Sequence, residues 1–217
     1  MIIYGSSFSP YVRKLLAYCE ERGIAFELKA VGIGDPDPGY AAASPLKKMP
    51  AIDDDGYRLA DSSAIIHYLE ARDGASGLIP AEAQARGRAI WFEEFADTVM
   101  GACVGAIFFN RIVAPVFLKR EGDLAAAIAA EREQWPAIRD YLQAELSDGR
   151  SWLVGDAFGL ADLAVGSALH NLAHAGIKCG DESDPLGAYF ERIKARPSFA
   201  RWTKKEYALL SAMTAGG

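Results

Sequence analysis

The feature that most constrains the fold is a change of hydrophobic pattern near residue 75. Before it, short apolar runs of strand length alternate with segments of helical spacing, and after it the apolar residues recur only at helical spacing. The first part predicts strands at 2–5, 25–31, 50–52 and 57–60, helices at 10–22 and 61–71, and a Pro/Gly-rich turn at 32–39. The sequence therefore predicts a small mixed sheet with helices, followed by a region built of helices alone.

The element order in the first part, β-α-β, a connecting segment, then β-β-α, is that of a thioredoxin-like α/β layer. The second part predicts long helices at 81–111, 123–146 and 160–174, with a kink at Trp135-Pro136, and short helices at 186–194 and 199–207. A Gly- and Pro-bearing segment separates the two parts. We expect a thioredoxin-like domain at 1–76, a linker at 77–84 and an all-α domain at 85–217.

Composition excludes several classes of partner. The 217 residues are 51% hydrophobic, which suffices for one large core or two modest ones. The net charge of −6 is spread along the chain and leaves no basic stripe for nucleic acid. Apolar stretches such as 99–109 are interrupted and shorter than the roughly 20 residues of a membrane span, and the first residues lack a signal-peptide pattern. We expect a cytoplasmic protein that binds neither nucleic acid nor membrane.

Cysteine and histidine spacing gives no sign of a metal site. The three cysteines, Cys19, Cys103 and Cys179, are far apart and form no C-x-x-C pair. His170 and His174 have i, i+4 spacing, but no carboxylate stands where helical zinc motifs place one. We expect neither a disulfide framework nor a metal ion.

Three serines, Ser6, Ser7 and Ser9, lie in the stretch YGSSFSPYVRK at residues 4–14. Ser9 precedes Pro10, which fits the first position of a helix, so the Ser9 oxygen is placed to cap that helix. A cap explains Ser9 by itself. It leaves the Gly-Ser-Ser turn before it unexplained.

Two signals further along the chain point to the same end of the sheet. Pro50 begins a predicted strand, and an X-Pro bond is the routine site of a cis peptide, which would turn the Met49 backbone outward to pair with an extended peptide. Asp61 and Ser62 stand at a helix start, where free amide groups and the helix dipole favour an anion. An ordinary N-cap is the alternative interpretation of the second signal.

Four segments of the chain carry motifs that occur in this order in one enzyme family. SSFSPYVRKLLAYCEERGI is similar to its first strand–helix unit, and SPLKKMPAI to its N-P-x-x-K-[VI]-P-x-[LI] segment with a cis proline. LADSSAIIHYLE is similar to its L-x-[ED]-S-x-A-I-x-x-Y-[LI] helix, and WLVGDAFGLADLAVGSAL to its [FWL]-[LIV]-x-G-x-x-x-[ST]-x-A-D signature. Over nearly its whole length the chain thus resembles the cytosolic glutathione S-transferase family.

The resemblance implies a transferase of detoxification that activates the glutathione thiol. In the zeta-like and tau-like members the catalytic serine lies at a fixed distance before the Gly that ends the first helix, and counting back from Gly23 reaches Ser9. Ser6 and Ser7 remain alternatives. A hydrogen bond donated to the thiolate lowers the thiol pKa, which is about 8.5 in free cysteine.

The resemblance also implies where the substrates bind. The residues that would hold glutathione are Lys48, Met49, Pro50, Asp61 and Ser62. The residues that would line an electrophile pocket between the domains are Phe8, Tyr11, Phe108, Phe109 and Arg111, although simple core packing is the alternative for each aromatic. A homodimer is expected from the resemblance and from the aromatic helix that carries Trp91 and Phe95.

Three departures from the family pattern qualify the resemblance. Ser44 stands where the family has Asn, Lys47 where it has Gly, and Gly159 where it has a Ser or Thr cap. The missing cap should weaken one helix start slightly, while Asp162 can still reach back to a backbone amide. Two other functions stay open: a glutathione-dependent reductase, isomerase or dehalogenase, and a non-catalytic interaction protein. The intact glutathione-binding set argues against the second.

Overall fold

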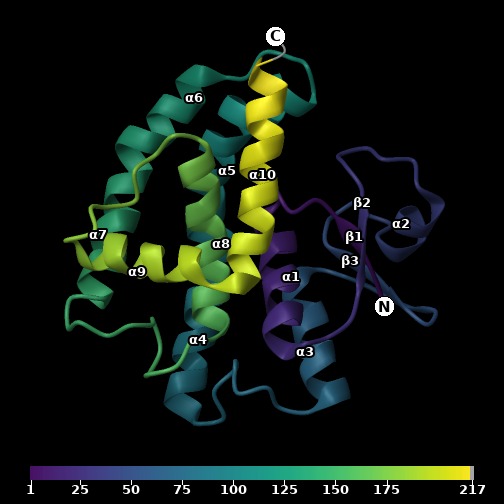
Figure 1. The fold of residues 1–217 in the computed structure, drawn as a ribbon, viewed down its shortest axis with the longest axis horizontal. Coiled ribbons are helices and arrows are strands. Elements are labelled where there is room, and N and C mark those ends of the chain that lie inside the picture. The colour runs from purple at the N-terminus through teal and green to yellow at the C-terminus, as the bar shows by residue number, and fades with distance from the viewer. Residues whose placement is uncertain (216–217) are drawn as a thin grey trace. The chain divides into compact units, whose positions relative to one another are not determined.

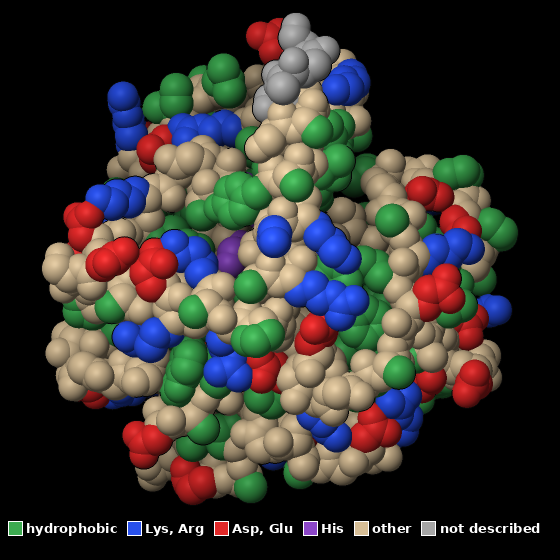
Figure 2. All heavy atoms as spheres, in the orientation of Figure 1, with side chains coloured by type: hydrophobic (Ala, Val, Ile, Leu, Met, Phe, Trp, Pro, Cys, Tyr) green, Lys and Arg blue, Asp and Glu red, His purple; other side chains and the backbone are tan. Residues whose placement is uncertain are grey.

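The computed structural model describes residues 1–215. The chain forms two compact units, Met1–Gly77 and Leu78–Gly217. The first unit contains a sheet with helices and the second contains helices only, so the predicted fold class, a thioredoxin-like α/β domain followed by an all-α domain, is confirmed. Acidic and basic side chains are interspersed over the face drawn in Figure 2, as the charge pattern of the sequence predicts.

The first unit is a four-stranded mixed sheet in the order β2-β1-β3-β4. β1 pairs in parallel with β2, whereas the β1–β3 and β3–β4 pairs are antiparallel. Figure 1 shows α1 and α3 on one side of this sheet and α2 on the other. The elements in chain order are β1 (Ile2–Gly5), α1 (Pro10–Arg22), β2 (Glu27–Ala30), α2 (Pro38–Ala43), β3 (Ala51–Asp54), β4 (Tyr57–Ala60) and α3 (Ser62–Asp73).

The predicted elements of this unit form for local reasons, and one element was missed. Gly23 ends α1 with a φ of 64°, in the left-handed region that glycine adopts without strain. The segment between β2 and β3, read from the sequence as a connection without structure, contains α2. Asp37 caps this helix by accepting the Tyr40 N–H at 2.8 Å, and Pro38 follows at the first position. Six residues are too few to show helical periodicity.

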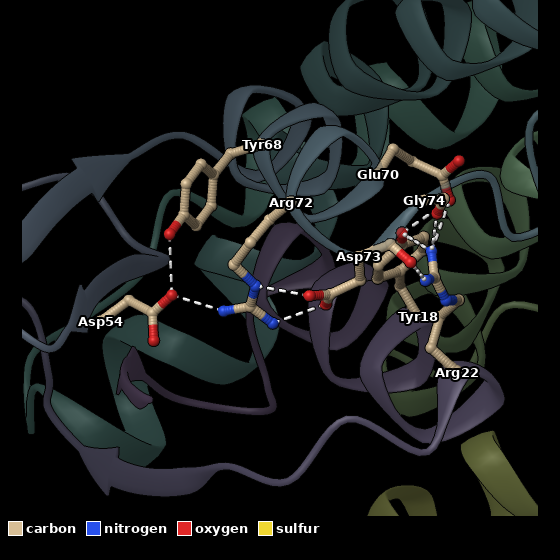
Figure 3. Close-up of polar contacts among 8 residues, drawn as sticks. All are labelled: Tyr18, Arg22, Asp54, Tyr68, Glu70, Arg72, Asp73 and Gly74. Carbon is tan, nitrogen blue, oxygen red and sulfur yellow. Dashed lines mark hydrogen bonds and ion pairs between the residues drawn. The ribbon is translucent and has the colours of Figure 1, made fainter.

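Two polar clusters fix the C-terminal half of α3, and Figure 3 draws both. In one, the Tyr18 hydroxyl donates to Glu70 at 2.7 Å, and Arg22 donates to Glu70 at 3.0 Å and to the Gly74 carbonyl at 3.1 Å. This cluster ties α3 to α1.

In the other cluster, Arg72 bridges Asp54 and Asp73, and the Tyr68 hydroxyl donates to Asp54 at 2.8 Å. Asp54 ends β3, so this cluster ties α3 to the β3–β4 hairpin. The two clusters together set the position of α3, which begins at Ser62.

The second unit consists of helices in its described part. They are α4 (Ala83–Phe95), α5 (Gly101–Phe108), α6 (Leu124–Ala129), α7 (Trp135–Glu145), α8 (Leu160–His174), α9 (Pro185–Ala195) and α10 (Pro197–Ala215), with π-helical segments η1 (Ala96–Met100), η2 (Phe109–Phe117) and η3 (Ala130–Gln134). Nearly every residue of α8 is buried, as its uninterrupted apolar sequence predicts. The predicted kink coincides with the change from η3 to α7 at Trp135. The helix predicted at 81–111 continues to Phe117, and α10 is longer than predicted.

The long helical stretch Ala83–Phe117 corrects one expectation from the sequence. One 18-residue window of it has a mean hydropathy of 1.7, which by length and composition alone is sufficient to cross a membrane. The expectation that the apolar stretches are too short is therefore wrong for this helix. Core helices pass the same test, and Cys103 and Ile107 of this stretch are completely buried where α5 packs on α8. These contacts place Cys103 and Ile107 of α5 in the core of the second unit.

The start of α8 explains one departure from the family pattern. Asp162 accepts the Gly159 N–H at 2.9 Å, which confirms the predicted backward bond, and it also accepts from Leu153 N–H and the Tyr189 hydroxyl at 3.0 Å each. A Cβ at Gly159 would lie 2.7 Å from the Leu78 carbonyl oxygen. Because that carbonyl accepts the Leu160 N–H at 2.8 Å, a capping Ser or Thr does not fit without moving the chain.

Candidate functional site

The register of the sheet brings three of the sequence signals to one end of it. Ala51 pairs with Tyr4 on one side and with Ala60 on the other. At this row of the sheet β1 and β4 are ending and β3 is beginning, so residues 6–9, 49–50 and 61–62 all leave the sheet at the same end. The Asp61 N–H donates to the Pro50 carbonyl at 3.2 Å and joins two of these segments directly.

The serine stretch forms a turn closed at the start of α1. The Ser9 N–H donates to the Ser6 carbonyl at 2.9 Å, and Ser9 is the N-cap residue of α1, as predicted. Its Oγ accepts the Val12 N–H at 3.5 Å, which is long for a hydrogen bond. Ser6, Ser7 and Ser9 are all partly exposed. The geometry therefore makes Ser9 a weak cap whose hydroxyl proton is not used by the capping bond.

The segment before β3 has the predicted cis Met49-Pro50 bond. Lys48 is exposed and Met49 is partly buried. Ser44 is buried, and its Oγ accepts the Lys48 N–H at 2.9 Å, so this side chain closes the turn at the position where the family has Asn. Lys47 has a φ of 55°, in the left-handed region, which explains why the family has Gly at that position.

The start of α3 combines a strained cap with a buried serine. Asp61 has a φ of 85°, which is costly for a residue with a side chain, and its Oδ1 accepts the N–H groups of Ser63 and Ala64 at 3.0 Å each. Ser62 follows as the first helical residue and is 2% exposed. The predicted N-cap is therefore present at Asp61. The helix start also keeps the positive dipole end that suits an anion.

A lysine that the sequence analysis did not single out also reaches this helix start. Lys14 of α1 is 1% exposed, and its Nζ donates to the Ser63 Oγ at 3.1 Å. Helical periodicity places Leu15 and Leu16 in the core, but it does not distinguish a buried lysine from one on the surface. The sequence signal available for this contact was the pair Ser62-Ser63 at a helix start, together with a lysine in the helix predicted at 10–22.

The residues expected to line an electrophile pocket belong to both units. In the first unit Phe8 is buried and Tyr11 is partly buried. In the second, Phe108 is buried against the His174 ring, with 6.5 Å between ring centroids. The ring of Phe109 lies under Arg120, and Arg111 forms an ion pair with Glu131 and donates to the Ala175 carbonyl at 3.4 Å.

The three cysteines are buried, and the two histidines of the i, i+4 pair lie against polar partners. Burial raises the pKa of Cys19 and Cys179 to about 12 and that of Cys103 to about 11, so all three thiols are protonated at neutral pH. His170 Nδ1 lies 2.7 Å from the Gly166 carbonyl oxygen, and His174 Nε2 lies 2.7 Å from Glu206 Oε2. Within residues 1–215 no group of three or more His, Cys, Asp or Glu side chains is arranged to hold a metal ion.

A thioredoxin-like domain with a cis proline before β3 and a Ser at the start of both α1 and α3, joined to a helical domain, defines the glutathione transferase class of fold. Comparison with known proteins agrees. The family models for the N-terminal and C-terminal domains of glutathione S-transferase match residues 3–77 and 106–197. The chain belongs to the glutathione S-transferase family.

Individual relatives span almost the whole chain. Glutathione S-transferase 3 of Zea mays is 29% identical over 92% of this chain and 91% of its own length. The uncharacterized GST-like protein YibF of Escherichia coli is 30% identical over 93% and 97%. The crystal structure of the theta class glutathione S-transferase from Xanthomonas axonopodis pv. citri, with glutathione bound, superposes with a TM-score of 0.79 at 26% identity, covering 93% of this chain and 96% of the other.

Proposed function

We propose that this chain is a serine-type glutathione transferase, of the zeta-like or tau-like kind, that activates the glutathione thiol for attack on small hydrophobic electrophiles. One observation carries the proposal. The sheet register brings Ser9, the start of β3 and the start of α3 to the same end of the sheet. The relatives named glutathione S-transferase and the structural neighbour with glutathione bound support glutathione as the co-substrate.

Each part of the tripeptide then has a partner in the first unit. Ser62 and the amide groups of the first turn of α3 hold the γ-glutamyl carboxylate, because the helix dipole favours an anion there. Asp61, the N-cap of α3, lies next to Ser62 and belongs to the same proposed binding site. The Met49 backbone pairs with the cysteinyl unit as an added strand would, next to Pro50. Lys48, which is exposed, lies near the glycyl carboxylate.

The thiol chemistry falls to the Ser9 hydroxyl. It donates a hydrogen bond to the thiolate and stabilises the charged form, so Ser9 needs no general base and is not itself the nucleophile. Ser6 and Ser7 are the alternative donors. The high pKa of all three buried cysteines argues against disulfide exchange through an enzyme thiol, because a protonated thiol is a poor nucleophile.

The remaining parts of the proposal concern the electrophile pocket, the domain bounds, the oligomeric state and the cellular location. Phe8, Tyr11, Phe108, Phe109 and Arg111 are our proposed pocket lining, with 1–76 and 85–217 as the two domains and 77–84 as the linker. We also propose a cytoplasmic homodimer that needs no metal and serves detoxification.

The proposed dimer is supported by an exposed aromatic residue on α4 and can be tested by the mass of the protein in solution. Trp91 is 47% exposed on α4, whereas Phe95 is buried, so Trp91 is the aromatic available to a second copy. Light scattering at micromolar concentration should give twice the chain mass of 23.4 kDa. A species of 23.4 kDa alone would contradict the dimer.

Calorimetric titration with glutathione tests the ligand, and conjugation assays with aryl and alkyl halides test the reaction. Heat of binding at millimolar glutathione or below, together with conjugate formation, supports the transferase. Absence of heat would overturn the ligand and the mechanism with it. Binding without conjugation of any electrophile would favour the non-catalytic interaction protein instead.

A further inference from the structure

Lys14 is a buried cation that contacts the start of α3. It lies on α1, the helix that begins after Ser9, and its ammonium group reaches across to α3. Figure 1 shows α1 and α3 side by side on one face of the sheet. Lysine is almost never completely buried without a charged or polar partner, because the ammonium loses its hydration. One such partner is the Ser63 Oγ, 3.1 Å away.

The end of α3 that Lys14 contacts is the unfavourable one for a cation. Ser63 is the second residue of α3, and the N-terminus of a helix carries the positive end of its dipole. A lysine placed there opposes the dipole, so it does not stabilise the helix by this route. It raises the positive potential at the point where the proposed site needs an anion.

Asp61, the N-cap of α3, supplies the opposite charge at the same helix start. Its Oδ1 is committed to the N–H groups of Ser63 and Ala64, which holds the carboxylate at the helix start. Lys14 of α1 and Asp61 thus place a positive and a negative group at the start of α3, where both are bonded to Ser63. The γ-glutamyl end of glutathione carries the complementary pair, an α-carboxylate and an α-ammonium on one carbon.

We propose that Lys14 is a positioning and specificity-determining residue for the γ-glutamyl end of the ligand. Through Ser63 it fixes the first turn of α3, and its charge favours the α-carboxylate held by Ser62, while Asp61 faces the α-ammonium. This inference rests on the proposed function, since it assigns a role within the glutathione site.

The test compares glutathione with two analogues that each lack one charge. In 4-aminobutyryl-cysteinyl-glycine the α-carboxylate is absent, and in glutaryl-cysteinyl-glycine the α-amino group is absent. Lys14→Met keeps the length of the side chain and removes its charge. We expect it to weaken binding of glutathione and of the glutaryl analogue by about tenfold, and to leave binding of the 4-aminobutyryl analogue within about twofold. Lys14→Arg should restore most of the affinity for glutathione.

One control variant and one alternative variant accompany this test. Lys29→Met removes a lysine of β2 that pairs with Asp37, the N-cap of α2, and this variant should bind all three ligands as the wild type does. If Lys14→Met does not fold, Ser63→Ala decides the matter, because it should weaken glutathione binding by about threefold without affecting the 4-aminobutyryl analogue. Equal weakening of all three ligands, or no weakening of glutathione, would overturn the inference. Failure of the wild type to bind glutathione would instead overturn the proposed function.

Discussion

Replacement of Ser9 by Ala distinguishes a catalytic hydroxyl from a helix cap, because the two roles predict different effects on the stability of the protein and on the thiol pKa of bound glutathione. The Oγ of Ser9 lies 3.5 Å from the Val12 nitrogen, at the outer limit of a hydrogen bond. A well-formed cap contributes about 1 kcal/mol, so this long one should contribute about 0.5 kcal/mol or less. The urea midpoint of unfolding of Ser9→Ala should therefore stay close to that of the wild type.

The effect on bound glutathione should be larger. A hydrogen bond to a charged group contributes about 1.5–3 kcal/mol, which corresponds to a change of about one to two units in the thiol pKa. With a shift of about 1.5 units, from about 7 to about 8.5, the thiolate fraction at pH 7 falls about 15-fold. A more basic thiolate is also a stronger nucleophile, by about fivefold for such a shift. The net loss of conjugation rate at pH 7 is then about threefold.

These opposing terms make the pH profile of conjugation diagnostic. Above both pKa values the fraction of thiolate is the same, so Ser9→Ala should conjugate faster than the wild type by about fivefold where chemistry limits the rate. Ultraviolet titration of the bound thiolate gives the pKa directly, and affinity for glutathione should change only a few-fold. Ser6→Ala and Ser7→Ala serve as matched variants.

The result that refutes the assignment is a pKa shift that follows a different residue. If the shift follows Ser6 or Ser7, Ser9 is only the cap of α1. If none of the three serines moves the pKa, a backbone amide or Tyr11 is the donor.

Three further predictions concern stability, measured by urea unfolding. Lys47→Gly should stabilise the chain by about 0.5 kcal/mol, because relief of left-handed strain exceeds the added entropy of glycine in the unfolded state, and Lys47→Ala should give no gain. Arg72→Met should cost about 1 kcal/mol at pH 7, and this cost should shrink as the pH falls below about 4, since Arg72 (with Tyr68 at Asp54) holds the pKa of Asp54 and Asp73 below the usual value and that stability is lost as the pH falls through the lowered values. A constant difference at all pH values would contradict it. Asp162→Ala should cost about 2 kcal/mol or more, because three donors lose their acceptor. Burial raises the pKa of Asp162 to about 6, above its unfolded value, so the wild type but not the variant should gain stability as the pH falls from about 7 to about 4.

Short-range signals in the sequence determined the capped ends of α1 and α3. Ser9 followed by Pro10, Gly23 after the first apolar stripe and Asp61 before Ser62 each act within one helical turn, so their role as caps could be recognised without the fold. The four motifs identified the family for the same reason, because each is a contiguous segment. The serine that activates the thiol and the linker at 77–84 stay predictions.

Tertiary structure decided what depends on neighbours distant in sequence. The helix after α4 continues to Phe117 past Pro115, where helical structure persists against the local propensity of proline. The absence of a capping side chain at Gly159 follows from the Leu78 carbonyl, 81 residues earlier. Lys14 reads as a surface residue of an amphipathic helix, and only the approach of α3, 49 residues away at Ser63, makes it a buried cation at the site. Burial and charge pairing across such distances depend on how the chain packs, which the local pattern of residues does not specify.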